Sequence, residues 1–253
     1  MTPSILVVQH EDDCGPDRLA GWLADAGVAL DVRRPYAGDP LPATVAGAEG
    51  ADGADGLVVL GGSMGAGDDA GHPWLTPTRA LLADAVTSGT PTLGICLGAQ
   101  LLAAACGGRV EVGGPGIEPG VLDIRWRPAA ADDPLCAGLP DPYPGPSMHK
   151  DAIVVLPPGA VWLAETDIYP HQVFRVGGAA WGVQFHPEVS EATFRSWTPG
   201  CAEDLALAGT DADRVVGALV ARDAEVVAAG RALASRFGAL VGQRAGLHEP
   251  SVT

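Results

Sequence analysis

A glycine-flanked cysteine at a change from strand to helix constrains the fold of this chain more than any other feature. The apolar run at 92–95 predicts a buried strand, and the run that starts at Leu97 predicts a helix. Gly94 and Gly98 flank Cys96 at this junction, where a sharp turn leaves no room for larger side chains. The sequence therefore predicts a cysteine in strained backbone at a helix N-terminus, where the helix dipole favours the nucleophilic thiolate. By itself the pattern fits a buried cysteine in a structural turn equally well.

Strands and helices alternate along the first part of the chain. Strands are predicted at 5–9, 30–33, 57–60 and 92–95, and helices at 16–26, 75–88 and 97–105. Such alternation is typical of a flavodoxin-like, doubly wound α/β fold with a mostly parallel sheet and right-handed crossovers. In that fold the functional residues lie at the carboxyl ends of the strands, and Cys96 follows one of those ends.

The second half of the chain changes from β-rich to helical. Short strands between proline- and glycine-rich turns are predicted at 121–126, 153–156, 160–164, 173–176 and 181–185. Helices are predicted at 191–197 and 202–208, followed by a long helical stretch at 211–241 whose apolar stripe is interrupted near Gly230. We interpret residues 1–190 as one domain with added antiparallel strands, 191–245 as a helical extension packed on it, and 246–253 as a frayed tail. Alternatively, the extension is a docking helix for a partner.

A histidine and a glutamate near the end of the β-rich region supply what a cysteine nucleophile needs. In the segment Gly-Val-Gln-Phe-His-Pro-Glu at 182–188, a predicted strand ends at His186 and Glu188 follows two residues later. A histidine near a thiol can take its proton and later protonate the leaving group, while a carboxylate fixes the imidazole tautomer. Cys96, His186 and Glu188 are therefore a candidate catalytic triad. The alternatives are a strand-end histidine bonded to backbone and a solvated acid at a helix start.

The segments at 94–100 and 182–188 together resemble the class I glutamine amidotransferase family, above all the glutaminase domain of GMP synthetase and its stand-alone relatives. The resemblance covers roughly the first 190 residues, and the glycine-rich segment at 60–65 follows a predicted strand where the family has its oxyanion loop. It implies Cys96 as nucleophile, His186 as acid and base, and Glu188 as the residue that orients the histidine. It also implies that the backbone N–H groups of Gly62 and Leu97 form the oxyanion hole.

Four further residues are implied as contacts to the substrate. Gln100 lies one helical turn beyond the cysteine on the same helix face, so its amide can reach a ligand above the thiol. Alternatively, it is a core glutamine bonded to backbone. Ser147, Met148 and His149 resemble the stretch with which the family holds the amino-acid end of glutamine. The family often has serine directly before this histidine, whereas this chain has Met148 there.

Composition excludes several other classes of protein. A net charge of −16 with scattered basic residues argues against nucleic-acid binding. Because the chain has neither a long apolar run nor a basic leader, we expect no membrane span, no signal peptide and a cytoplasmic location. Five cysteines without Cys-x-x-Cys spacing argue against disulfides and a zinc site, so we expect no metal and no cofactor. The sequence also lacks the Walker A and Ser-Gly-Gly-x-Asp-Ser motifs, so the chain alone cannot use ATP.

These features predict an enzyme that hydrolyses the γ-amide of glutamine through a cysteinyl γ-glutamyl thioester. The ammonia would pass to an unidentified acceptor or to a synthetase partner. A stand-alone γ-glutamyl peptidase or hydrolase would use the same residues with a different leaving group. A non-catalytic binding module on the same fold is the third interpretation.

Overall fold

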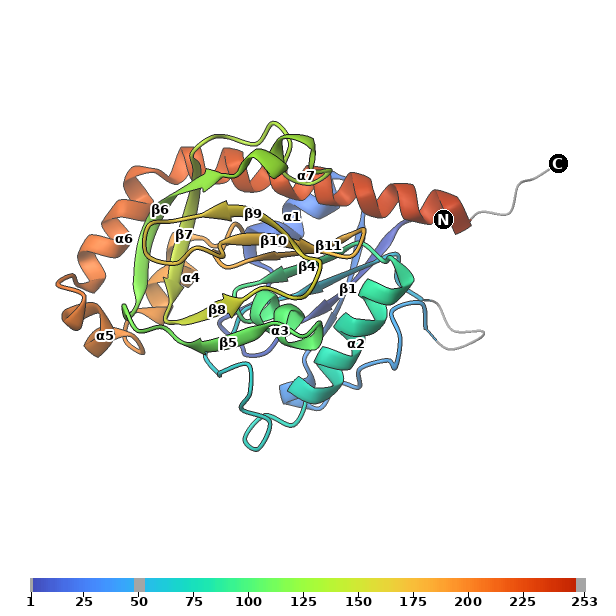
Figure 1. The fold of residues 1–253 in the computed structure, drawn as a ribbon, viewed down its shortest axis with the longest axis horizontal. Coiled ribbons are helices and arrows are strands. Elements are labelled where there is room, and N and C mark those ends of the chain that lie inside the picture. The colour runs from blue at the N-terminus through green and yellow to red at the C-terminus, as the bar shows by residue number, and fades with distance from the viewer. Residues whose placement is uncertain (1, 48–52, 249–253) are drawn as a thin grey trace.

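The centre of the fold is a nine-stranded sheet in a computed structural model that describes residues 2–47 and 53–248 (Figure 1). Its strand order is β2-β1-β3-β4-β11-β10-β9-β6-β7. The strands are β1 (Ser4–Val8), β2 (Ala29–Arg33), β3 (Gly56–Val59), β4 (Thr92–Ile95), β6 (Glu118–Trp126), β7 (Tyr143–His149), β9 (Val161–Glu165), β10 (Val173–Val176) and β11 (Ala180–Val183). β5 (Arg109–Val112) and β8 (Asp151–Val155) form a separate antiparallel pair.

One half of the sheet is parallel and the other half is antiparallel. The pairs among β2, β1, β3, β4 and β11 are parallel, and those from β11 to β7 are antiparallel. The predicted α/β fold with a parallel sheet and added antiparallel strands is confirmed. Because β4 pairs directly with β11, the two sequence motifs around Cys96 and His186 meet at the carboxyl ends of neighbouring strands.

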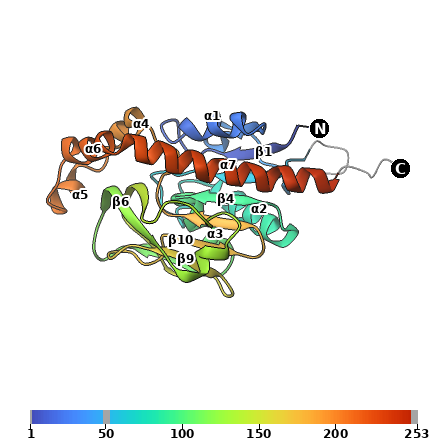
Figure 2. The ribbon, with the colours of Figure 1, turned by 90° about the horizontal axis from the view of Figure 1, so that it is seen from above.

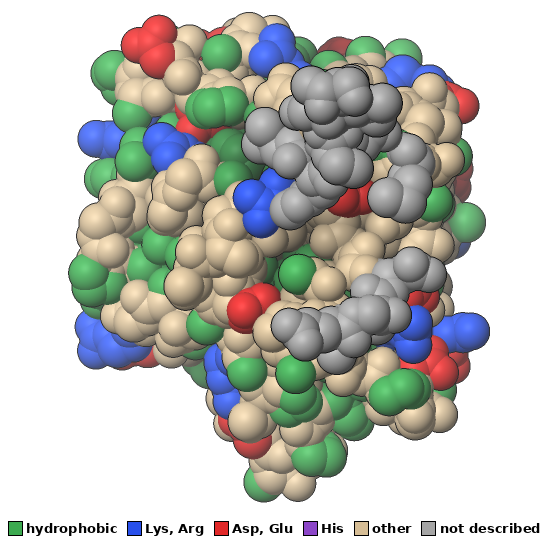
Figure 3. All heavy atoms as spheres, turned by 90° about the vertical axis from the view of Figure 1, so that its right-hand side faces the viewer, with side chains coloured by type: hydrophobic (Ala, Val, Ile, Leu, Met, Phe, Trp, Pro, Cys, Tyr) green, Lys and Arg blue, Asp and Glu red, His purple; other side chains and the backbone are tan. Residues whose placement is uncertain are grey.

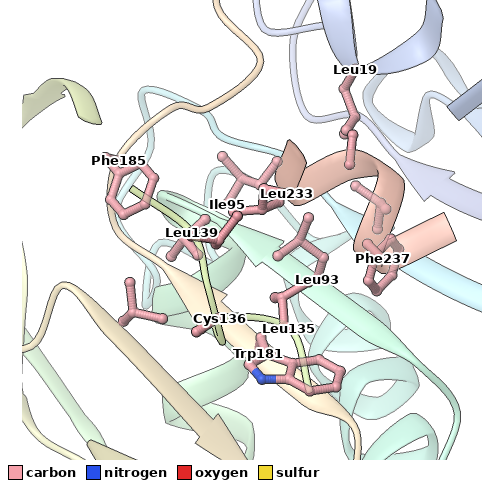
Figure 4. Close-up of a cluster of buried hydrophobic side chains, with 14 of the residues drawn as sticks. Leu19, Leu93, Ile95, Leu135, Cys136, Leu139, Trp181, Phe185, Leu233 and Phe237 are labelled. Carbon is pink, nitrogen blue, oxygen red and sulfur yellow. The ribbon is translucent and has the colours of Figure 1, made fainter. Parts of the chain in front are cut away.

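Helices cover both faces of the sheet (Figures 1 and 2). α1 (Asp17–Asp25) and α7 (Asp223–His248) lie on one face, and α2 (Leu75–Ser88) and α3 (Leu97–Ala105) lie on the other. Strand side chains alternate between the two faces, as Ile5 and Leu6 show by packing into different core clusters. In the first cluster, Leu233 and Phe237 of α7 lie beside Leu19 of α1, over the strand residues of β4 (Figure 4).

Two strands were not predicted from the sequence, β5 and β7. β7 contains two prolines and a glycine, which usually argue against a strand. It lies at the edge of the sheet, where a missing N–H can face away from the ladder. The segment 146–149, which we interpreted only as a substrate-binding motif, is therefore the end of an edge strand paired with β6.

The stretch predicted to be helical at 211–241 is helical, but it forms two helices that are separated at Arg222. The C-terminal helices are α4 (Glu191–Trp197), α5 (Ala202–Leu207), α6 (Ala212–Ala221) and α7, with Arg222 between the last two; short 3₁₀ helices occur at Pro35–Ala37 and Pro128–Asp132. α7 passes through Gly230 without a break. A Cβ there would lie 2.5 Å from the Pro187 carbonyl oxygen and 2.6 Å from the Trp22 ring, so the glycine allows the helix to approach both closely. The tail predicted at 246–253 is wrong for 246–248, which belong to α7, and residues 249–253 lie outside the described part.

Charged side chains of both signs are interspersed on the face of the molecule shown in Figure 3. This agrees with the scattered basic residues of the sequence. Within residues 2–47 and 53–248, no helix has both the length and the apolar character that a membrane crossing requires.

Candidate active site

Cys96 occupies the turn between β4 and α3 in a backbone conformation that side chains rarely adopt. Its φ is 51° and its ψ is −106°. The two flanking glycines are needed because a Cβ on Gly94 would lie 2.5 Å from the Gly98 carbonyl oxygen, and one on Gly98 would collide with the Val59 carbonyl oxygen. The strand, turn and helix predicted around this cysteine are confirmed, and the side chain lies at the N-terminus of a buried helix.

The glycine loop after β3 lies directly against the turn. A Cβ on Gly61 would meet the His186 ring carbon Cε1 at 2.8 Å, and one on Gly62 would meet Leu97 at 3.0 Å. Glu11 fixes this loop by accepting hydrogen bonds from the backbone N–H of Ser63 at 2.7 Å and from its hydroxyl at 2.8 Å. Leu97 is the first residue of α3, so its N–H has no acceptor within the helix. The loop and the helix start thus bring two backbone segments to one side of the thiol.

His186 and Glu188 form a buried pair beside Cys96. The His186 Nδ1 atom lies 2.7 Å from the Glu188 Oε1 atom, and both side chains are buried. Burial lowers the pKa of His186, but Glu188 and the Cys96 sulfur together raise it more strongly, to about 10. A shift in this direction favours the protonated form of the ring, which lies beside the sulfur. Trp197 of α4 covers the imidazole, with 4.5 Å between the ring centroids.

Two buried glutamines connect the Cys96 sulfur to the first residue of β8. Gln184 Nε2 donates to the Cys96 sulfur at 3.7 Å, and Gln100 Nε2 donates both to Gln184 Oε1 at 3.3 Å and to the Asp151 carbonyl oxygen at 3.0 Å. Gln100 lines the cavity above the thiol, but its amide N–H groups already have protein acceptors. Gln184 was not singled out from the sequence, although it lies within the motif that contains His186.

The predicted substrate-binding residues on β7 differ in their placement. Met148 and His149 line the cavity, whereas the Ser147 hydroxyl is fully buried and donates to the Glu118 carbonyl oxygen at 2.6 Å. His149 uses both ring nitrogens within the protein, with Nε2 3.1 Å from the Glu118 carboxylate and Nδ1 3.0 Å from the Asp151 carbonyl oxygen. Sequence reasoning missed Glu118, because its pairing with β7 depends on the sheet register.

The cavity above Cys96 has a volume of about 500 Å³. Its wall includes Cys96, Gly62 and His186 together with residues from the helices after position 190, namely Ser196, Trp197, Gly200, Cys201 and Asp204. The sequence gives no signal for this contribution, since it depends on how α4 and α5 pack in the tertiary structure. In the described part of the chain, no group of three or more His, Cys, Asp or Glu side chains could hold a metal ion. Cys96 and His186 line the cavity and Glu188 contacts His186, an arrangement that can support nucleophilic chemistry at the thiol.

Known proteins resemble this chain in sequence and in fold. Residues 19–197 match the family model described as glutamine amidotransferase class-I. Over 152 residues the chain is 36% identical to one subunit of the glutamine-hydrolyzing GMP synthase of Halobacterium salinarum, an alignment that covers 58% of this chain and 75% of that protein. Over 105 residues it is 42% identical to the glutamine-hydrolyzing GMP synthase of Thermus thermophilus, covering 41% of this chain. This second alignment spans only 20% of the longer protein.

Solved structures show the same fold over nearly the whole chain. A glutamine amidotransferase from Methylobacillus flagellatus has a TM-score of 0.78 at 27% identity, with 96% of this chain and 95% of that chain covered. A glutamine amidotransferase from Thermotoga maritima has a TM-score of 0.80 at 24% identity and covers 94% of this chain and 99% of its own. The C-terminal helices are therefore included in the shared architecture.

Proposed function

The chain belongs to the class I glutamine amidotransferase family, and from this premise we propose that it hydrolyses the γ-amide of glutamine at Cys96. One observation carries the proposal: a cysteine at a strained turn and helix start lies beside a buried His186–Glu188 pair at the base of a cavity. A histidine and carboxylate in this relation to a thiol are the parts that acyl transfer requires.

Each residue has a defined step in the proposed reaction. The Cys96 thiolate attacks the γ-carbonyl carbon, and the oxyanion accepts hydrogen bonds from the backbone N–H groups of Gly62 and Leu97. His186 protonates the departing ammonia, which leaves a γ-glutamyl thioester on the sulfur. His186 then takes a proton from the attacking water, and collapse of the second tetrahedral intermediate releases glutamate and regenerates the thiolate. Glu188 keeps the imidazole oriented throughout by accepting a hydrogen bond from the Nδ1–H group.

We further propose that the ammonia passes to a synthetase partner. A relative that this chain matches over three quarters of that protein's length is named as one subunit of a GMP synthase, which supports a division of the reaction between two chains. The absence of ATP-binding motifs from the sequence supports it as well. Because a partner of this kind would stimulate the reaction, we expect the isolated chain to hydrolyse glutamine more slowly than the complex does.

Glutamate release by the purified chain tests the proposed reaction. We expect slow but measurable hydrolysis of glutamine by the wild-type chain and no hydrolysis above background by Cys96→Ser, because the serine hydroxyl stays protonated at neutral pH. Cys106→Ser is a matched control, since Cys106 lies at the far end of the same helix and does not line the cavity. Equal glutamate release by wild type and Cys96→Ser would contradict the proposal. Absence of release from all three proteins, with folding intact, would instead favour a binding module.

A γ-glutamyl peptidase is the second candidate function. The observation that favours it is the extent of the cavity, which continues past the thiol to Trp197, Cys201 and Asp204 and so offers space for a larger leaving group. Glutamine remains our first choice, because the family match covers both motifs.

Comparing substrates separates these two functions. We expect kcat/KM for glutamine to exceed that for γ-glutamyl dipeptides and glutathione. A preference for any of these peptides above about tenfold, which corresponds to about 1.4 kcal/mol of differential transition-state binding, would reverse the choice.

A further inference from the structure

We propose that Gln184 is a further catalytic residue, which donates a side-chain N–H to the Cys96 thiolate, and that Gln100 fixes the direction of this donor. The proposal deepens the proposed function, because it takes Cys96 as the nucleophile. It rests on a continuous chain of hydrogen bonds from the Asp151 carbonyl oxygen through Gln100 and Gln184 to the sulfur.

Sheet register places Gln184 beside the cysteine. β11 runs parallel to β4 with Val183 opposite Ile95, and the Cys96 N–H donates to the Val183 carbonyl oxygen at 2.8 Å. Gln184 and Cys96 are the residues that directly follow this pair, one after each strand. Along extended backbone, alternate residues face the same side, and the contacts of Gln184 and His186 place both beside the thiol. The same segment thus brings a proton-transfer group and an amide donor to one sulfur atom.

The orientation of the Gln184 amide follows from its neighbour. An amide group has one acceptor and one donor end, and only the hydrogen-bond network decides which way each points. The Gln100 NH₂ group can only donate, and it lies 3.3 Å from the Gln184 oxygen, so that oxygen must face Gln100. The Gln184 NH₂ group consequently faces the sulfur. The second donor of Gln100 is used by the Asp151 carbonyl oxygen, which holds Gln100 itself in place.

A donor at this position stabilises the thiolate more than the thiol. Both glutamines are buried, with exposed fractions of 3% for Gln100 and 2% for Gln184, so little water competes for the sulfur. A hydrogen bond to a charged acceptor is stronger than one to a neutral acceptor. The Gln184 donor would therefore act together with the helix N-terminus in stabilising negative charge that develops on the Cys96 sulfur.

The test is the pH dependence of Cys96 alkylation by iodoacetamide, measured on the full chain by mass spectrometry of the Cys96 peptide. In Gln184→Met, which removes the donor without adding charge, we expect the midpoint of the rate profile to rise by about one pH unit or more. Gln184→Glu keeps the side-chain length but presents a carboxylate, and it should raise the midpoint further. If Gln184→Met does not fold, Gln184→Leu provides the same comparison, because it also removes the donor without adding charge.

Gln9→Leu is the matched control. Gln9 is also a buried glutamine directly after a parallel strand, and its amide donates to the Glu11 carbonyl oxygen without contacting the sulfur. We expect its midpoint to equal that of the wild type. Gln100→Leu should raise the midpoint by less than Gln184→Met, because it frees the amide of Gln184 to turn but does not remove it.

The two possible failures give different results. If folded Gln184→Met and Gln184→Glu titrate with the wild-type midpoint, Gln184 is not a thiolate donor, and the inference is overturned while the proposed function stands. If the wild-type chain releases no glutamate and Cys96 alkylates no faster than Cys106, the proposed function itself fails.

Discussion

Replacing His186 with alanine is expected to lower kcat for glutamine hydrolysis by about 10⁴- to 10⁶-fold, the range found when the base of a catalytic triad is removed. The loss is large because this ring both stabilises the thiolate by its charge and protonates the leaving ammonia. The measurement is steady-state glutamate release by the folded variant, with the wild-type chain assayed at the same pH.

Two other substitutions serve as comparisons for His186→Ala. Glu188→Gln should be less damaging by about a hundredfold, because a residue that orients the base matters less than the base itself. His149→Ala should affect KM more than kcat, since this ring lines the cavity while both its nitrogens are bound to Glu118 and Asp151 and not to Cys96. If His149→Ala reduced kcat as strongly as His186→Ala, the assignment of the acid and base would be wrong.

The second large effect concerns the turn that holds the nucleophile. Gly98→Ala is expected to destabilise the fold by about 3 kcal/mol or more, because the new methyl group would collide with the backbone carbonyl of Val59. Neither backbone segment is free to move, since Val59 ends a central strand and Gly98 lies in the first turn of a buried helix. Urea unfolding of variant and wild type gives the difference in free energy of unfolding.

Gly217→Ala is the control for this glycine. Gly217 lies in α6, is exposed, and has no atom within 4 Å of the position a Cβ would take. Alanine there should stabilise the protein by about 0.5 to 1 kcal/mol through its better helix propensity. If Gly98→Ala were as stable as wild type, the tight packing described for the turn would be contradicted.

Local patterns were sufficient to predict the parallel half of the fold. The strands β1, β3 and β4 are short apolar runs bounded by glycine, proline or charged residues, and each predicted position lies within a residue or two of the observed one. The position of Cys96 at a strand end follows from the same pattern. In these regions the backbone geometry is decided by neighbouring residues, such as Gly94 and Gly98, and so it can be read from the sequence.

The parts that were missed depend on contacts between distant segments. β7 forms despite its prolines because the edge of the sheet tolerates them, and Glu118 meets His149 only through the register of β6 with β7. Gly230 suggested an interruption of the apolar stripe of the C-terminal helix, whereas it lets α7 approach Pro187 behind the His186–Glu188 pair. A glycine needed for close approach and one that weakens a helix look the same in a sequence.

The contribution of the C-terminal helices to the cavity was also not predictable. The sequence predicts Trp197 only as the last residue of a short helix, yet in the structure its ring packs against the His186 imidazole. Gln100 was predicted as a substrate contact because it lies one turn from Cys96. Whether its amide reaches a ligand or another side chain depends on Gln184, which β11 brings beside it.

Labelling with a diazoketone analogue of glutamine tests the central claim most directly. Burial raises the pKa of the thiols of Cys14, Cys106, Cys136 and Cys201, which leaves these four protonated at neutral pH. We expect one adduct per chain, located by peptide mapping on Cys96, and protection of that site by excess glutamine. Labelling that is spread evenly over the five cysteines, or that is absent from Cys96, would contradict it.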